Sequence, residues 1–141
     1  MNGAELHLAV NHLPVLGPPF AAALLAAGAA KRSPDLLKAG FWTLVVTGVA
    51  AVPVYYSGQS AADVVTTLTD SGTLEIGRHF HAAKLTLQAC LIAGGIAAFL
   101  LFRNIASRKA AAFMLALALG LSGLGAWTAH LGGEIRHPEI R

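Results

Sequence analysis

The side chains of this chain best suited to chemistry are its six histidines, and all of them stand beside the same ends of four apolar segments. They are His7, His12, His79, His81, His130 and His137. Neutral imidazole binds transition-metal ions and haem iron, and ionisable residues at membrane depth usually mark a functional site. The grouping therefore predicts a haem or metal site on one side of a membrane.

The apolar segments that must position these histidines set the class of the protein. Hydrophobic residues make up 55% of the 141-residue chain and charged residues only 12%, with a mean hydropathy of +0.62. Globular chains carry about 25% charged residues, and a membrane-spanning helix needs about 20 mainly apolar ones. Four windows meet that requirement, at about 6–30, 36–56, 79–102 and 110–131. We predict an all-α integral membrane four-helix bundle that forms a single transmembrane domain over residues 1–141.

Charged residues between the segments predict how the bundle sits in the membrane. The first and third connections carry Lys31, Arg32, Lys38, Arg103, Arg108 and Lys109. Basic connections of this kind remain in the cytoplasm, so both termini and the outer loop, 57–78, should lie on the extracytoplasmic side of a bacterial inner membrane. The net charge of +3 then reflects topology, and the basic residues are too dispersed for nucleic-acid binding.

Local signals near the histidines predict a kink and a short helix. Three prolines interrupt the hydrogen-bond ladder of the first segment beside His12 and should kink it. These prolines are Pro14, Pro18 and Pro19. In the outer loop, Ser60 followed by Asp63 resembles a capping box, which predicts a short interfacial helix over about 61–68. Such a helix would fit as a lid over the histidines.

Grooves of small side chains below two of the histidines favour haem over a bare metal ion. At about 100° per residue, His79 shares a stripe with Ala83, Thr86, Cys90 and Gly94, and His130 shares one with Ala126, Gly123 and Ala116. Small side chains leave room for a flat macrocycle against the backbone. The alternative is that both stripes are tight helix contacts, which small residues commonly make in membranes.

His81 points away from His79 in the predicted third helix. The two lie about 200° apart, so one helix cannot direct both rings at one iron, and there are either two sites or a bystander histidine. Gln88, on the His81 face, must find a polar partner, which argues that this face is also buried in protein. Arg78 and Arg136 could pair with haem propionates, or instead with nearby glutamates.

Two short motifs carry a family resemblance. The opening His7-Leu-Ala-Val-Asn-His12-Leu-Pro14 and the closing Leu131-Gly-Gly-Glu-Ile135 resemble small bacterial four-helix membrane proteins of domain-of-unknown-function family 2231. That family typically has a Val-His-Phe-Pro-like element and a Tyr and His-Gly run, where this chain has Asn11-His12-Leu13-Pro14 and Arg136-His137-Pro138-Glu139. The resemblance covers the whole hydrophobic layout and implies a four-helix membrane fold and these histidine positions. A looser analogy, of architecture alone, is to bis-histidine b-type cytochromes.

These observations predict a membrane-bound b-type cytochrome with one or two bis-histidine haem b groups near the outer face. His12, His79 and His130 are the first candidates for ligands, followed by His7 and His81, with His137 last. Two neutral imidazoles saturate haem iron, which suits one-electron transfer better than enzymatic chemistry of its own. The predicted partners are membrane lipid, a quinone or membrane dehydrogenase, a periplasmic redox protein and a second copy of the chain.

Two other hypotheses stay open from the sequence. Three or four of the histidines could bind copper or zinc for metal delivery, sensing or structural clamping, since imidazole suits both ions. With only Met1 and Met114 and the single Cys90, the chain lacks the sulfur-rich stretches common where Cu(I) is handled. The third hypothesis is a structural assembly subunit whose histidines are polar helix caps.

Overall fold

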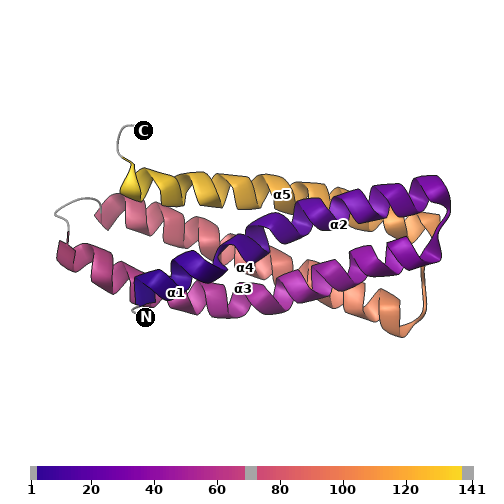
Figure 1. Ribbon diagram of the computed structural model, residues 1–141, viewed down its shortest axis with the longest axis horizontal. Helices are drawn as coiled ribbons and strands as arrows, with labels where there is room; N and C mark the ends of the chain where they lie inside the picture. Colours follow the sequence, from indigo (N-terminus) through magenta and orange to yellow (C-terminus); the bar gives the residue numbers. More distant parts are fainter. Residues whose placement is uncertain (1–2, 69–72, 138–141) are drawn as a thin grey trace.

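The computed structural model describes residues 3–68 and 73–137, and nearly all of them are helical. The five α-helices of this part are α1 (Gly3–Val10), α2 (His12–Lys31), α3 (Pro34–Leu68), α4 (Thr73–Phe102) and α5 (Arg108–Arg136). They run side by side along one elongated bundle, and α1 lies at the same end as the last turns of α5 (Figure 1). α1 and α2 together count as one of the four long helices of the bundle, because one continuous span, Ala4–Lys31, covers them both. The predicted all-α four-helix bundle is therefore confirmed.

Four stretches of the described helices are long and apolar enough to cross a membrane. They are Ala4–Lys31, Pro34–Val64, Leu74–Phe102 and Arg108–Ile135. Large apolar side chains cover the outside of the bundle: Phe20, Trp42 and Val49 are 61%, 58% and 67% exposed. Contiguous apolar surface of this kind marks a membrane or protein contact, so the structure is compatible with a multi-pass membrane protein.

The helices at the histidine end are longer than the sequence predicted. Residues 57–68, expected in the outer loop, continue α3, and the interfacial helix expected over 61–68 is the end of that helix. α4 likewise begins at Thr73, within the expected loop. Ser57 starts a polar run that resembles a loop in composition, but its hydroxyl donates to the Val54 carbonyl at 2.8 Å within the helix. Local hydrogen bonding of this kind lets a polar segment remain helical.

A break at Asn11 separates α1 from α2. It lies in the histidine half of the first long helix, where the prolines predicted a kink. The cause is Pro14, which has no backbone N–H to donate to the carbonyl four residues earlier and whose ring clashes with that carbonyl. That carbonyl belongs to Val10, the last residue of α1. Beyond the break α1 packs mainly against α3, which carries His7 toward α3.

Two similar helical hairpins, α2–α3 and α4–α5, make up the bundle. The first helix of each is followed by a left-handed residue, Arg32 or Asn104, both with a φ of 53°. The second helix of each is preceded by a serine, Ser33 or Ser107, whose Oγ accepts a backbone N–H three residues further on, at 3.4 and 3.2 Å. A residue in the first helix of one hairpin is equivalent to the residue 72 positions later in the other hairpin, as Arg32 is to Asn104. In the second helices the difference is 74, as between Ser33 and Ser107.

Buried positions recur at the same offsets. In the first helices the buried pairs include Pro14 and Thr86, Pro18 and Cys90, Ala21 and Ala93, Ala22 and Gly94, and Leu25 and Ala97. In the second helices they include Leu37 and Ala111, Leu44 and Ala118, Thr47 and Leu121, Val54 and Thr128, and Ser57 and Leu131. Each hairpin also packs against the other through both of its helices, α2 against α5 and α3 against α4. The two halves are therefore structural repeats, although few residues are identical between them.

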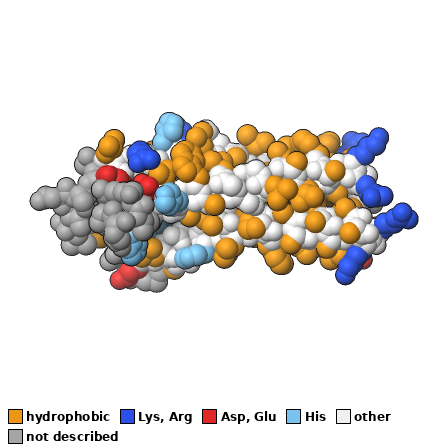
Figure 2. Space-filling model, turned by 90° about the horizontal axis from the view of Figure 1, so that it is seen from above, with side chains coloured by type: hydrophobic (Ala, Val, Ile, Leu, Met, Phe, Trp, Pro, Cys, Tyr) orange, Lys and Arg blue, Asp and Glu red, His pale blue; other side chains and the backbone are white. Residues whose placement is uncertain are grey.

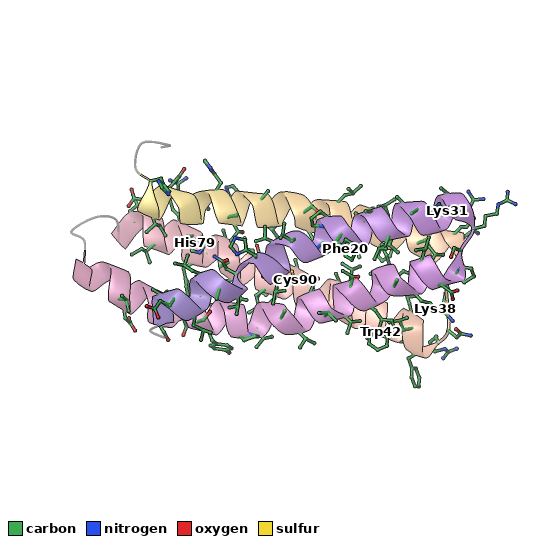
Figure 3. The ribbon with its side chains drawn as sticks, in the orientation of Figure 1. Phe20, Lys31, Lys38, Trp42, His79 and Cys90 are labelled. Carbon is green, nitrogen blue, oxygen red and sulfur yellow. The ribbon has the colours of Figure 1, made fainter. Side chains whose placement is uncertain are left out.

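Close packing is concentrated in the half of the bundle near the basic connections. Phe41, Leu25, Leu44 and Met114 are fully buried there. Lys31 and Lys38 mark this end, and His79 lies toward the other (Figure 3). The hydrophobic core does not extend to the histidine end, which leaves room for the site described below.

Valine at Gly48 should destabilise the bundle, because α3 and α4 approach closely at this glycine. A Cβ at Gly48 would lie 2.8 Å from the Cys90 carbonyl oxygen and 3.5 Å from the Gly94 Cα, so the helices must separate. We expect Gly48→Val to remove about 2 kcal/mol of the free energy of unfolding, measured as a lower thermal midpoint in detergent. Gly120→Val is the matched control, since nothing lies within 4 Å of a Cβ at Gly120. Equal midpoints for the two variants would contradict the close-contact argument.

Candidate cofactor site

The histidine end of the bundle encloses a cavity of about 470 Å³, within the size range of small-molecule and cofactor sites. Its lining comes from all five described helices and consists mainly of apolar side chains and glycines. His7, His12, His79 and His137 are among the lining residues. Figure 2 shows histidines toward this end of the visible face and a group of Lys and Arg side chains at the other. The cavity therefore lies where the sequence places its histidines.

His7 enters the cavity from α1 with its Nδ1 atom turned toward α3. Nδ1 lies 3.1 Å from the Val54 carbonyl oxygen and 3.1 Å from Ser57 Oγ. A carbonyl oxygen can only accept, so the neutral ring carries its proton on Nδ1 and keeps its lone pair on Nε2. The ring lies over Gly58, where a Cβ would come within 3.1 Å of the ring carbon Cε1. Glycine is therefore the residue that lets this imidazole approach α3.

His79 enters the cavity from α4 in the same way. Its Nδ1 lies 3.0 Å from the Thr128 carbonyl oxygen on α5, so Nε2 again holds the lone pair. A Cβ at Gly132 would lie 3.0 Å from its Cε1. The Thr128 hydroxyl donates to the Leu124 carbonyl and shares a 2.8 Å hydrogen bond with the Thr86 hydroxyl, which ties α4 to α5 below the ring.

His7 and His79 have the same surroundings in the two repeats. In each, Nδ1 donates to the carbonyl of a residue on the second long helix of the same repeat, α3 or α5, and the ring covers the glycine four residues further along that helix. His7 and His79 are equivalent at the offset of 72, and Gly58 and Gly132 at the offset of 74. The histidine and its glycine are among the few identical residues of the two halves. Each half of the bundle therefore presents one oriented imidazole.

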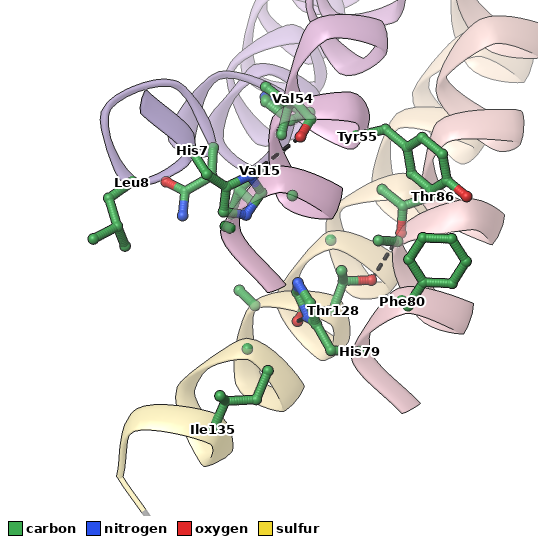
Figure 4. Close-up of a pocket in the computed structure, with 18 of the residues that line it drawn as sticks. His7, Leu8, Val15, Val54, Tyr55, His79, Phe80, Thr86, Thr128 and Ile135 are labelled. Carbon is green, nitrogen blue, oxygen red and sulfur yellow. Dashed lines mark hydrogen bonds between the residues drawn. The ribbon is translucent and has the colours of Figure 1, made fainter. Parts of the chain in front are cut away.

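Both imidazoles belong to the same cavity. Figure 4 shows His7 and His79 on two sides of it, with Thr128 beside His79 and Val54 beside His7. Both histidines are among the residues that line it. Two lone pairs on Nε2 atoms are thus available within one largely apolar space.

One residue of the cavity lining also carries a buried polar atom without a partner among the described residues. The side-chain oxygen of Asn11, at the break between α1 and α2, is buried and makes no hydrogen bond in the described structure. Asn11 lines the cavity. Buried polar groups in proteins nearly always have a partner, so this oxygen is an exception within the described part of the chain.

The other histidines do not enter the cavity as these two do. His12 and His137 line it, but both are exposed. His81 is exposed in a shallow surface groove with Arg78 and Trp127. His130, with the Ala126, Gly123 and Ala116 stripe expected below it, is on the exposed face of α5.

Arg78 and His130 share a carboxylate. Glu134 is buried, and its two oxygens lie 3.5 Å from Arg78 Nη1 and 3.3 Å from His130 Nε2. The sequence left two partners open for Arg78, a haem propionate or a nearby glutamate. In the structure Arg78 pairs with a glutamate. The side chain of Arg136 lies outside the described part of the structure.

A multi-histidine metal centre is not assembled by the described residues. Among residues 3–68 and 73–137, no group of three or more histidine, cysteine, aspartate or glutamate side chains is placed to hold a metal ion. A copper or zinc site of three or four histidines would need such a group. Two imidazoles are enough for haem iron, which takes its other four ligands from the macrocycle.

No family model matches this sequence, and comparison with curated proteins and with solved structures found no significant match. The resemblance of the two terminal motifs to family 2231 therefore stays a prediction. Function has to be argued from the geometry of the cavity.

Proposed function

We propose that the protein is a membrane-bound b-type cytochrome that holds a single haem between His7 and His79 and transfers electrons one at a time. The observation that carries the proposal is the matched pair of imidazoles, one from each repeat, with Nδ1 bonded to a backbone carbonyl and Nε2 left free. Metal-binding histidines almost always donate the other ring N–H in this way, because the bond fixes the tautomer and the ring orientation.

The shape and polarity of the cavity support haem in particular. Apolar walls and glycines suit the face of a macrocycle, and the histidine rings are held by helices on different sides of the space. His12 and His137 at the exposed edge could meet the propionates, which favours an orientation with the polar edge of the haem toward the aqueous side.

Two strong axial ligands define the kind of chemistry proposed. When bound, haem supplies a reversible one-electron iron couple. With His7 and His79 both bound to it, the iron would have no open position for oxygen, and the backbone carbonyls that hold the two rings would keep them fixed between oxidation states. The role is electron transfer, with a membrane quinone or dehydrogenase as the donor and a periplasmic protein as the acceptor.

The proposed membrane orientation follows the basic residues. Lys31, Arg32 and Lys38 at the first connection, with their counterparts at the third, support a cytoplasmic location for that end of the bundle in a bacterial cell. The cavity then opens toward the extracytoplasmic side of the inner membrane. An acceptor protein outside the membrane could reach the haem edge there.

Absorption spectroscopy of the purified protein tests the proposal. The protein, expressed in cells with sufficient haem supply and purified in mild detergent, should show a Soret band and a sharp reduced-minus-oxidised α band. Its haem content should approach one per chain. Elemental analysis is the companion measurement: iron should equal haem, with no stoichiometric copper or zinc. Zinc or copper without a chromophore would replace this proposal with a non-haem site.

A further inference from the structure

The two repeats place equivalent pairs of helices on opposite sides of the cavity. One pair is α3 and α4, and the other is α5 with the first long helix, α1 and α2. At the offsets of 74 and 72, Tyr55 of α3 corresponds to Ala129 of α5, and Phe80 of α4 corresponds to Leu8 of α1. All four residues line the cavity. Comparing the two pairs therefore shows how each side of the cavity is closed.

Two aromatic rings close the side between α3 and α4. The ring centroids of Tyr55 and Phe80 are 5.3 Å apart, and the Tyr55 ring also packs edge-on against Tyr56 at 5.7 Å. Aromatic rings at these separations are in stabilising contact. Phe80 is 42% exposed, but its ring spans the space between its own helix and α3.

The equivalent pair on the other side is too small to close it. Ala129 has a methyl group where α3 has the phenol ring of Tyr55, and both Ala129 and Leu8 are exposed although they line the cavity. Figure 4 shows Leu8 at the edge of the pocket, across from Tyr55 and Phe80. Residues that are exposed and line a cavity at the same time lie where the cavity opens, so the cavity opens between α1 and α5.

The course of the first long helix explains the opening. A Cβ at Gly125 would lie 3.7 Å from the Val15 Cα, so α2 and α5 are in contact there. Ala129 is one turn further along α5, and Leu8 lies beyond the break at Asn11. Past that break α1 packs mainly against α3, and Figure 1 shows it running toward α3 and away from α5. The distance between the two helices therefore widens toward the histidine end.

The rim of the opening is apolar with imidazoles beside it. Leu8 and Ala129 belong to two stretches able to cross a membrane, Ala4–Lys31 and Arg108–Ile135, so the opening faces sideways from the bundle. The other exposed residues of the lining on this side are His12, which begins α2, and His137, which follows α5. A rim of this composition suits an amphipathic ligand, whose apolar part passes between the helices while its polar part stays at the histidines.

We propose that the gap between α1 and α5 is the entrance to the cavity, and that haem passes Leu8 and Ala129 sideways from the membrane. The apolar edge of the macrocycle enters first, and the propionates remain near His12 and His137. The identity of the ligand rests on the proposed function, whereas the position of the entrance does not.

Closing the entrance with the residues of the closed side tests the proposal. Leu8→Phe combined with Ala129→Tyr should slow haem transfer from lipid vesicles into the haem-free protein about 10-fold or more, within the one to three decades that association rates of related complexes span. Release should slow by the same factor, because entry and exit cross one barrier, and the spectrum and the affinity should stay unchanged. Leu13→Phe combined with Ala126→Tyr is the matched control, since both residues are exposed on the same helices and lie outside the cavity lining.

Three results would overturn the entrance. They are wild-type rates in the closed variant, slower uptake with faster release, which indicates a damaged site, and equal slowing in the control. Reopening the other side supplies a rescue: Tyr55→Ala combined with Phe80→Leu, added to the closed variant, should restore fast transfer.

A cysteine inside the cavity tests the entrance without haem. Ala51 lines the cavity and is 4% exposed, so a thiol introduced by Ala51→Cys reacts only with a reagent that has entered. At alkaline pH, which supplies the reactive thiolate, an apolar maleimide dissolved in the membrane should modify it, and the closed variant should react about 10-fold more slowly or less. The native Cys90, 1% exposed and outside the lining, should stay unmodified. Equal rates, or no reaction at Ala51→Cys, would overturn the entrance, whereas gated labelling of a protein that takes up no haem would overturn the proposed function alone.

Discussion

Alanine in place of either His7 or His79 is expected to remove stoichiometric haem from the protein. Each imidazole would supply one bond to the haem iron, so loss of either removes one of the two proposed ligands. Even disturbing the groups that orient a metal ligand costs about 10- to 100-fold in affinity, so losing the ligand itself should cost at least about 100-fold. The measurement is the ratio of Soret absorbance to protein, together with haem titration of the apoprotein.

The other histidines provide matched controls. His81→Ala and His130→Ala remove exposed rings that do not line the cavity and should leave haem content near the wild-type value. Loss of haem in His12→Ala or His130→Ala, with haem retained in His7→Ala, would mean that the ligands are those first expected from the sequence. Circular dichroism of every variant separates loss of the cofactor from loss of the fold.

Hydrophobicity alone was enough to predict the architecture, because membrane spans carry a strong compositional signal. The four apolar windows correspond to helices long enough to cross a membrane, and the histidines lie toward one end of the bundle. Helix ends were predicted less well. Ser57 and Gly58 resemble loop residues by type, yet they lie within α3, one as a hydrogen-bond partner and the other as the surface under the His7 ring.

The choice of histidine pair could not be derived from helical periodicity. His79 was correctly placed above Ala83 and Thr86, which line the cavity, because α4 is regular there. His7 depends on the break at Asn11 and on the packing of α1 against α3, which are tertiary features. Its carbonyl partner, Val54, has no sequence signature at all.

The internal repeat was also invisible in the sequence, for a physical reason. Helix packing constrains the size and burial of a position more than its identity, so Pro18 can correspond to Cys90 and Leu25 to Ala97. The identical residues of the two repeats include three with a fixed geometric demand: the serine that caps the second helix, the histidine, and the glycine under its ring. A pairwise comparison of the halves weighted toward such residues could have found the site.

Side chains added at Gly58 and Gly132 should displace the imidazoles and weaken haem binding without removing a ligand. A Cβ at Gly132 would already lie 3.0 Å from His79 Cε1 and 3.2 Å from Nδ1, and the corresponding distances from Gly58 to His7 are 3.1 and 3.4 Å. Alanine should push each ring by a few tenths of an ångström, and valine further, which also stretches the bond from Nδ1 to the carbonyl. We expect haem affinity to fall in a graded series, reaching about 10- to 100-fold for Gly132→Val.

The graded series distinguishes an orienting role from a purely structural one. Gly123→Val on the same helix is the matched control, since nothing lies within 4 Å of a Cβ there and the change in helix propensity is the same. If His79 and His7 only stabilise helix packing, valine at Gly132 or Gly58 should lower the thermal midpoint of the haem-free protein. The absorption spectrum of the haem-loaded protein should then stay unchanged. If they are the axial ligands, the low-spin bands of the haem-loaded protein should shift toward high spin in the glycine variants, because a displaced imidazole no longer reaches the iron at bonding distance. The histidines and their glycines would then be one functional unit, repeated once in each half of the bundle.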